Sequence, residues 1–248
     1  MRPEFVLQTQ AAELKHWWFV YRRQLLSDEL LKHFKPASGL RVLDLGCGTG
    51  GNLDAFKFLG ELSGLELNPQ AAELARAKGH RVLTGSVGDL AKLFAGESFD
   101  VIFMLNVLYH RAAPSEALVL ADVLKLLKPG ALLLWTEPAL PFLFRHHDRV
   151  DEGKKRYTYA ELRAVVEASG LKLKRLSAFN GCLLPLVALG ALWDRVFPST
   201  SSASAELAVP PLGLNQLLLA CFQLERCLLR CINFRWGVTY MVVAEKTT

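Results

Sequence analysis

Apolar positions along the chain fall into short runs separated by longer stretches with helical spacing. Short apolar runs bounded by turn residues predict strands, and the periodic stretches between them predict helices. Strands that alternate with helices predict an α/β fold with a doubly wound parallel sheet, whose ligand lies at the carboxyl ends of the strands. The predicted strands start at residue 40 and then cover residues 61–67, 81–84, 99–105, 131–136, 171–178 and 238–245.

The stretch on which the fold depends joins the first strand to a cluster of glycines. Residues 40–52 read LRVLDLGCGTGGN. Gly46, Gly48 and Gly50 remove Cβ atoms where the backbone must turn sharply, and the helix that follows offers free N–H groups. A nucleotide-like ligand is therefore expected to lie against this loop.

Two carboxylates near the loop discriminate between classes of ligand. Gly46, Gly48 and Gly51 also fit the dinucleotide-binding fingerprint, with Glu66 as its acidic residue about 20 positions later. Asp44, however, would repel a pyrophosphate over the loop and attract a cation. S-adenosylmethionine is a sulfonium with an α-ammonium group and no phosphate, so it fits Asp44, while Glu66 can accept hydrogen bonds from its ribose. The rival interpretations are an NAD-dependent oxidoreductase and a protein that binds S-adenosylmethionine without transferring its methyl group.

Three motifs resemble those of one enzyme family. VLDLGCGTG at residues 42–50 resembles the first motif of the class I S-adenosylmethionine-dependent methyltransferases. SFDVI at 98–102 resembles the family's fourth strand, and LLKPGA at 126–131 resembles its turn into the fifth. The resemblance covers roughly residues 40–137. It implies a Rossmann-like, seven-stranded methyltransferase fold, closed by its last two strands as an antiparallel pair, with S-adenosyl-L-methionine as cofactor.

The cofactor site follows from the residues that match the family, with one departure. After the third strand many relatives carry an acidic residue that holds the adenine amino group, whereas this chain has Gly85-Ser86-Val87. The Ser86 hydroxyl and the backbone at Val87 can take its place. The predicted cofactor-binding residues are Asp44, Gly46, Cys47, Gly48, Gly50, Asn52, Glu66, Leu67, Ser86, Val87, Leu105 and Asn106.

Polar clusters follow the fourth and fifth strands and so reach the same edge of the sheet. NVLYHR at residues 106–111 places Tyr109 and His110 beside the expected methyl group. A histidine with a pKa near neutrality suits a hydroxyl acceptor that must lose its proton, so His110 is the first candidate base. The alternative is that His110 only caps the next element or shapes the pocket.

The second cluster lies within residues 137–158. His147 and Asp148 are candidates for a base and the group that orients it, the alternative being a structural turn at His146 to Asp148. Arg156 and Tyr157 suit an anionic acceptor.

The amino-terminal region, residues 4–33, has helical spacing and carries HWWF followed by paired arginines. Bulky aromatics beside arginines suit a cap over a substrate pocket or a membrane interface, and packing on the sheet is an equally good interpretation. These clusters together resemble a bacterial subgroup of the family with a hydrophobic carboxyl-terminal extension. The predicted substrate-binding residues are Trp17, Trp18, Arg22, His146, Arg156 and Tyr157.

An apolar insertion, residues 179–234, is far longer than a hairpin loop. Its segments 182–197 and 212–231 flank a Ser-rich linker at 198–205. The first apolar run is shorter than the roughly 20 residues that span a bilayer, and the second is interrupted by polar residues. Three interpretations stay open: a cap over the active site, a pair of helices lying in a membrane surface, and a dimer contact. In the membrane interpretation, Arg226, Arg230 and Arg235 face the head groups.

Length and composition limit the remaining choices. A chain of 248 residues suits one α/β domain with an insertion. The net charge of +5 is scattered and its five cysteines form no Cys-x-x-Cys pair, so neither nucleic acid nor a metal is expected. Without a secretory signal pattern, we expect a cytoplasmic monomer or homodimer, with docking at the inner membrane face as an option, acting on a small or lipid-like acceptor. The predicted units are a helical cap at 1–36, a core at 37–178 and 235–248, and the insertion at 179–234.

Overall fold

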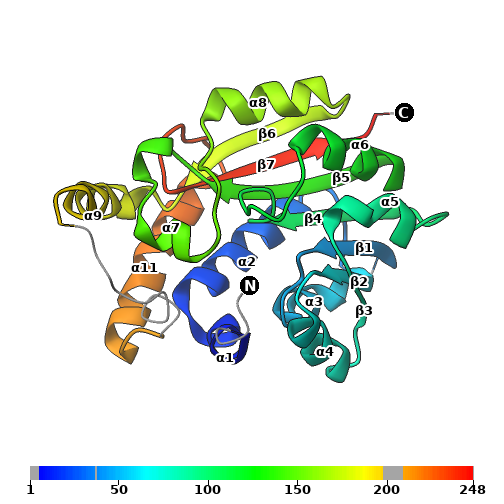
Figure 1. The fold of residues 1–248 in the computed structure, drawn as a ribbon, viewed down its shortest axis with the longest axis horizontal. Coiled ribbons are helices and arrows are strands. Elements are labelled where there is room, and N and C mark those ends of the chain that lie inside the picture. Colours follow the sequence, from blue (N-terminus) through cyan, green and yellow to red (C-terminus); the bar gives the residue numbers. More distant parts are fainter. Residues whose placement is uncertain (1–5, 37, 198–208, 248) are drawn as a thin grey trace.

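The protein, seen in a computed structural model that describes residues 6–36, 38–197 and 209–247, is built on one seven-stranded sheet (Figure 1). Its strand order is β3-β2-β1-β4-β5-β7-β6, and β7 alone runs antiparallel to its neighbours in this sheet. The predicted doubly wound sheet with an antiparallel closing pair is confirmed. The strands are β1 Leu40–Leu45, β2 Gly60–Glu66, β3 Arg81–Thr84, β4 Phe99–Leu105, β5 Leu127–Pro138, β6 Lys172–Phe179 and β7 Thr239–Glu245.

The strand order reverses at β1, which lies between β2 and β4. At such a point the connections leave in opposite directions, so a crevice opens beyond the carboxyl ends of the strands. The glycine loop follows β1 and therefore lies at this crevice.

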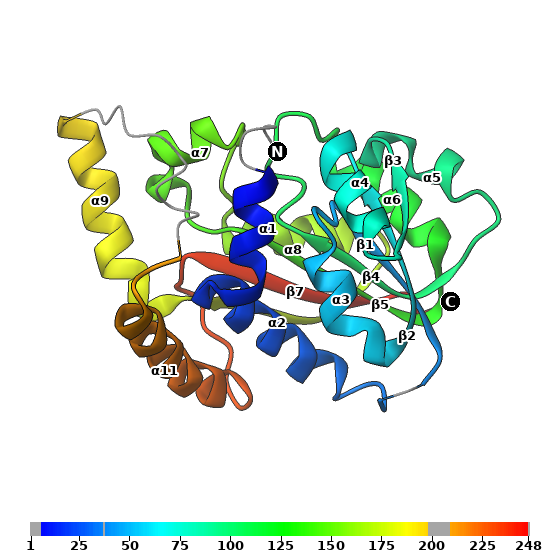
Figure 2. The same ribbon diagram turned by 90° about the horizontal axis from the view of Figure 1, so that it is seen from below.

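Helices cover both faces of the sheet (Figures 1 and 2). Along β4, the side chains of Val101 and Phe103 belong to one apolar core and those of Ile102 and Met104 to the other, as the period of two in a strand requires. The first core is covered by α2, α3 and α11, and the second by α5, α6 and α8. The helices are α1 Val6–Lys15, α2 Trp17–Leu30, α3 Gly51–Phe56, α4 Pro69–Ala77, α5 Leu90–Leu93, α6 Glu116–Leu126, α7 His146–Val150, α8 Tyr159–Ala168, α9 Leu184–Val196 and α11 Leu212–Leu229.

The start of β5 differs from the sequence prediction. The expected turn at residues 128–130 lies inside β5, which already pairs with β4 at Leu127. The register between β4 and β5 shifts between Phe99 and Val101, and Gly130 has a φ of +76°. The residues expected to form a turn therefore form an irregularity in the pairing of β5 with β4.

The amino-terminal region is two helices, with the break at His16. His16 caps α2, its Nδ1 accepting a hydrogen bond from the Trp18 amide at 3.2 Å. Asn215 of α11 holds the same break, because its Oδ1 accepts from the Trp17 amide at 2.9 Å and its Nδ2 donates to the Lys15 carbonyl at 3.0 Å. A residue of the insertion thus fixes the junction of α1 and α2.

The insertion packs against the amino-terminal helices through buried polar contacts. Glu225 of α11 accepts hydrogen bonds from the Tyr21 hydroxyl at 2.6 Å and from the amides of Asn180 and Gly181 at 3.0 and 2.6 Å. From this junction α9 and α11 diverge along one end of the molecule (Figure 2). Among the described residues, none of the helices combines the length and the apolar character needed to cross a bilayer.

Candidate active site

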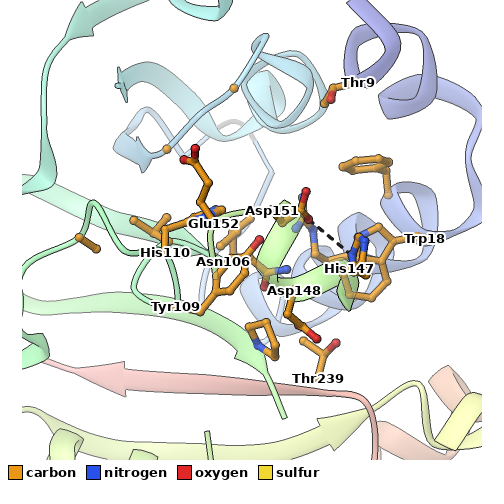
Figure 3. A pocket seen from close by; sticks show the side chains of 18 of the residues that line it. Thr9, Trp18, Asn106, Tyr109, His110, His147, Asp148, Asp151, Glu152 and Thr239 are labelled. Atoms are coloured by element: carbon orange, nitrogen blue, oxygen red, sulfur yellow. Dashed lines mark ion pairs between the residues drawn. The ribbon is translucent and has the colours of Figure 1, made fainter. Parts of the chain in front are cut away.

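A cavity of about 520 Å³ lies at the crevice, within the range of roughly 300–1,000 Å³ that is usual for ligand pockets. Its floor is formed by the glycine loop and by the ends of β2 and β4, and its walls by α1, α2, the segment 145–156 and the start of α9. Figure 3 shows Thr9 and Trp18 reaching into it from the amino-terminal helices, with Tyr109, His110 and Glu152 opposite.

The glycine loop has the backbone conformation that its sequence predicts. Gly46, Gly48 and Gly50 have φ values of +71°, +58° and +86°, which residues with a Cβ rarely adopt. A Cβ on Gly46 would lie 3.0 Å from a methyl group of Val107. The amides of Gly46 and Cys47 donate to the Leu65 carbonyl, which ties the loop to the end of β2.

Glu66 supports this loop from the end of β2. Its carboxylate accepts hydrogen bonds from the amides of Gly48 and Asn68, both at 2.8 Å, and it still lines the cavity. Because each carboxylate oxygen has a second lone pair, these contacts leave capacity for the hydroxyl groups of a ribose.

Asp44 and Arg22 form a buried pair of opposite charges with unused hydrogen-bonding capacity. Asp44 is fully buried behind Asn52, whose Nδ2 donates to Oδ2 at 3.2 Å, and Oδ1 has no hydrogen-bond partner among the described residues. Arg22, which lines the cavity, likewise keeps a buried Nε without a partner there. Burial raises the pKa of Asp44 to about 7, against the lowering effects of Asn52 and Arg22. The Oδ1 of Asp44 can accept a hydrogen bond from the ammonium group of an amino acid, and the Nε of Arg22 can donate one to its carboxylate.

Most of the predicted cofactor residues come together at the cavity. Asp44 and Gly50 do not line it: Asp44 lies behind Asn52, and Gly50 caps α3, where a Cβ would lie 3.1 Å from that of Ala75. The Ser86 hydroxyl accepts a hydrogen bond from the Gly88 amide at 3.1 Å, so the local turn uses part of its capacity. The predicted residues that line the cavity are Gly46, Cys47, Gly48, Asn52, Glu66, Leu67, Ser86, Val87, Leu105 and Asn106.

Tyr109 and His110 lie at the cavity, but the pKa of His110 differs from the prediction. Burial lowers the pKa of His110 to about 4, so the expected pKa near neutrality is wrong. Burial also raises the pKa of Tyr109 well above its usual value, which keeps the phenol protonated. Near neutral pH, His110 is an uncharged imidazole and Tyr109 is a hydrogen-bond donor.

Glu137, at the end of β5, holds the loop that carries these two residues. Its carboxylate accepts hydrogen bonds from the amides of Leu108 and Tyr109 at 2.8 and 3.2 Å and from Nε1 of Trp135 at 2.7 Å. Burial raises the pKa of Glu137 to about 8, although these donors lower it. The position of Tyr109 and His110 therefore depends on a buried carboxyl group.

The expected pair of His147 and Asp148 is wrong. These residues lie on the short helix α7, where residues four apart share a face whereas adjacent residues do not. His147 pairs with Asp151, with Nε2 and Oδ2 3.5 Å apart (Figure 3). Asp148 instead accepts from Nε of Arg156 and from the Arg145 amide, both at 2.9 Å.

Two predicted substrate residues lie away from the cavity. Tyr157 packs in the core beneath α6 and α8, where its hydroxyl donates to Glu116 at 2.7 Å, and His146 does not line the cavity either. Arg156 lines it, but its charge is already balanced by Asp148.

The aromatic pair at the start of α2 lines the cavity and also packs against the apolar core on that face of the sheet. Trp17 stacks on Phe222 of α11, with ring centroids 4.9 Å apart, and Trp18 stacks on Phe179 at 5.7 Å. The side chain of Arg22 lies over the Trp18 ring, 5.6 Å from its centroid. Both tryptophans and Arg22 line the cavity.

Several cavity residues were not predicted, and Glu13 is the most informative. Its carboxylate accepts from the Thr49 hydroxyl at 2.5 Å, and a Cβ on Gly51 would lie 2.6 Å from its Oε2. A lone glutamate on an amphipathic helix indicates a surface position, whereas the doubled glycine at 50 and 51 could have indicated the close approach of another segment. Other unpredicted lining residues are Thr9, His16, Arg145, Asp151, Glu152, Asn180 and Thr239.

The strand order, the glycine loop and the carboxylates at the ends of β1 and β2 are those of the class I S-adenosylmethionine-dependent methyltransferase fold. The comparison with known families agrees, because residues 43–135 match the family model described as a methyltransferase domain. Residues 43–135 therefore form a methyltransferase domain, as the motifs predict, and S-adenosyl-L-methionine is the cofactor of the class I methyltransferases that share this fold.

The first of the curated relatives match less than half of this chain. The tRNA U34 carboxymethyltransferase of Cronobacter sakazakii is 32% identical over 126 residues, which are 47% of this chain and 38% of that protein. The chain thus spans well under half the length of the curated relatives it matches.

Solved structures resemble the chain over its full length. A methyltransferase in complex with the Haloferax volcanii Trm112 activator covers 100% of both chains, with a TM-score of 0.62 and 20% identity. The plantazolicin methyltransferase BamL, solved with a desmethyl substrate analogue and SAH, covers 100% of this chain and 92% of its own, with a TM-score of 0.62 and 14% identity. At these identities the likeness concerns the fold.

Proposed function

We propose that the chain transfers a methyl group from S-adenosylmethionine to a small amphipathic acceptor. The observation that carries this proposal is the composition of the cavity, which joins a polar cofactor end to an apolar end. Arg22 and Glu66 line one end, and Asp44, which does not itself line the cavity, is held there by Asn52 of the lining. Trp18, Leu183 and Val187 supply apolar surface at the other.

The cofactor end explains how the ligand would be held. The unused Oδ1 of Asp44 suits the α-ammonium group, the Arg22 guanidinium suits the α-carboxylate, and Glu66 suits the ribose hydroxyls. When bound, S-adenosylmethionine supplies an electrophilic methyl group on a sulfonium. The chain's own contribution is to fix that group and to exclude water from it.

The acceptor reacts by an in-line displacement. Its nucleophilic atom forms a bond to the methyl carbon while the bond from that carbon to sulfur breaks, and the sulfur keeps the electron pair. Because the pKa of His110 is lowered to about 4, this imidazole suits the orientation of an acceptor by a hydrogen bond better than full removal of its proton. Positioning, rather than strong general-base catalysis, is therefore the main source of acceleration.

The acceptor end favours a molecule with a polar and an apolar part. Arg145, His147 and Asp151 line the cavity close to the apolar start of α9. A lipid-linked, isoprenoid or polyketide-like acceptor combines these two characters. The chain acts as a monomer or homodimer in the cytoplasm in this proposal.

An RNA acceptor is the second candidate, and the relatives named as tRNA U34 carboxymethyltransferases favour it. Among the first three of these relatives, the similarity covers at most 47% of this chain. The matched methyltransferase domain, residues 43–135, does not include α9 or α11. The prediction that nucleic acid is not a substrate stays a prediction.

The test is to incubate the purified chain with methyl-labelled S-adenosylmethionine and a host extract, and then to separate lipids, soluble metabolites, protein and RNA. We expect label in the lipid or metabolite fraction. The Asp44→Asn variant is the control, because it removes the charge that we assign to the ammonium group and should leave that fraction unlabelled. Label confined to RNA would favour the second candidate, and label confined to protein, or none in any fraction, would contradict both.

A further inference from the structure

Helices α9 and α11 lie at one end of the molecule (Figures 1 and 2), and their exposed side chains give this end an apolar surface. Leu189 and Trp193 of α9 are 65% and 64% exposed, and Leu224 of α11 is 68% exposed. We refer to this surface as the α9–α11 face. Its large exposed side chains are Leu186, Leu189, Leu192, Trp193, Val196, Phe197, Leu212, Leu214, Leu217, Leu224 and Leu228, with Ile232 and Trp236 just beyond α11.

The exposed charged side chains on this face are cationic, although Asp194 of α9 is partly exposed and Arg230 forms an ion pair with Asp28 of α2. In the described parts of the insertion and the residues after it, 181–197 and 209–236, the exposed charged side chains are those of Arg195, Arg230 and Arg235. The carboxylate of Glu225 is buried. An apolar surface with cations around it and tryptophans among its exposed residues is complementary to a bilayer whose head groups are anionic.

The same helix reaches the cavity with its other face. Leu183, just before α9, and Val187 within it line the cavity, whereas Leu186 and Leu189 lie on the exposed side. Since residues three and four apart share a helix face, Leu183 and Val187 lie on one side of α9 and Leu186 and Leu189 on the other, so one helix separates the apolar end of the cavity from the outer surface. An amphiphile that enters beside α9 would pass from a membrane to the acceptor site without crossing water.

We propose that the α9–α11 face docks on the surface of an anionic lipid bilayer and that the acceptor is an amphiphile taken from that bilayer. The helices lie on the membrane and do not span it. The choice of acceptor rests on the proposed methyltransferase function, whereas the docking itself does not.

The test is co-sedimentation of the full chain with vesicles of phosphatidylcholine and phosphatidylglycerol, compared with vesicles of phosphatidylcholine alone. We expect the wild type to bind the anionic vesicles, with a loss of binding in high salt because the cations contribute. Leu189→Gln and Leu224→Gln should each lower the partition coefficient roughly fivefold, since each removes apolar area from the docked face.

Leu118→Gln is the matched control. Leu118 lies on α6, away from the α9–α11 face, and is 65% exposed, as Leu189 is. Its substitution should leave vesicle binding unchanged. Wild type that stays in the supernatant, or an equal loss for Leu118→Gln, overturns the docking proposal. Light scattering that shows a wild-type dimer converted to monomer by Leu189→Gln also overturns it, in favour of a second copy on this face.

Calorimetric titration with S-adenosylhomocysteine separates this result from the methyltransferase proposal. All three variants should bind it as the wild type does, because none of their side chains lines the cavity. If the chain binds S-adenosylhomocysteine but not vesicles, the docking proposal fails and the methyltransferase proposal stands. If it binds vesicles but not S-adenosylhomocysteine, the methyltransferase proposal fails and the docking proposal stands.

Discussion

Asp44 is the residue on which the choice of ligand depends. It is fully buried, it keeps one oxygen without a partner, and its burial raises its pKa to about 7. A cation that binds here stabilises the ionised form, so binding is linked to loss of a proton.

We therefore predict that the affinity for S-adenosylhomocysteine rises with pH. Below a pKa of about 7 the empty site must first release a proton, whereas above it the carboxylate is already charged. The dissociation constant should be about tenfold larger at pH 6 than at pH 8. Asp44→Asn should bind weakly at both values. Calorimetry over this range measures both effects, and equal pH dependence in wild type and Asp44→Asn would assign the titration to another group.

Glu137 gives a second prediction, about stability. Burial raises its pKa from the usual value to about 8, so in this range the folded protein holds a proton that the unfolded chain releases. A raised pKa gives a contribution to stability that is fully present at low pH and is lost as pH rises towards about 8. The Glu137→Gln variant cannot titrate at this position and so serves as the reference.

The free energy of unfolding of the wild type, relative to Glu137→Gln, should fall as pH rises from about 5 to about 8, by up to roughly 1 kcal/mol per pH unit. Urea titrations of both proteins across this range measure it. An opposite slope would mean that the three donors to Glu137 keep it ionised.

At the scale of elements, the insertion and the amino-terminal helices form one polar junction. Glu225 of α11 accepts from Tyr21 of α2, and Asn215 holds the break between α1 and α2. Trp17 and Trp18, which line the cavity, are held by this junction through their stacking on Phe222 and Phe179. The insertion thus supports one wall of the cavity.

Tyr21→Phe should lower the free energy of unfolding by about 2 kcal/mol, because it removes a buried hydrogen bond to a carboxylate while keeping the ring. Tyr159→Phe is the control, since the Tyr159 hydroxyl makes a longer contact of 3.3 Å to the Leu176 carbonyl and lies outside this junction. Urea denaturation compares the two. Equal losses would show that the hydrogen bond to Glu225 contributes no more to the free energy of unfolding than the longer contact of the Tyr159 hydroxyl does.

At the scale of the whole molecule, local pattern was sufficient for the sheet and for the glycine loop. Strand runs, turns and the positive φ of Gly46 depend on neighbours in sequence, so they can be predicted from it. The direction of the Tyr157 side chain and the contact of Asn215 with the α1–α2 break depend on how distant segments pack. The low pKa of His110 likewise arises from burial, which no local pattern indicates.

The most direct test of the account is the mass of the product formed with S-adenosylmethionine that carries a deuterated methyl group. The wild-type chain, the cofactor and the lipid fraction of the extract are incubated together, and the products are compared with those of Asp44→Asn. The account predicts an amphiphilic product that carries the deuterated methyl group and is absent with the variant. A product of unchanged mass, which would indicate a rearrangement, or deuterium found only in RNA would contradict it.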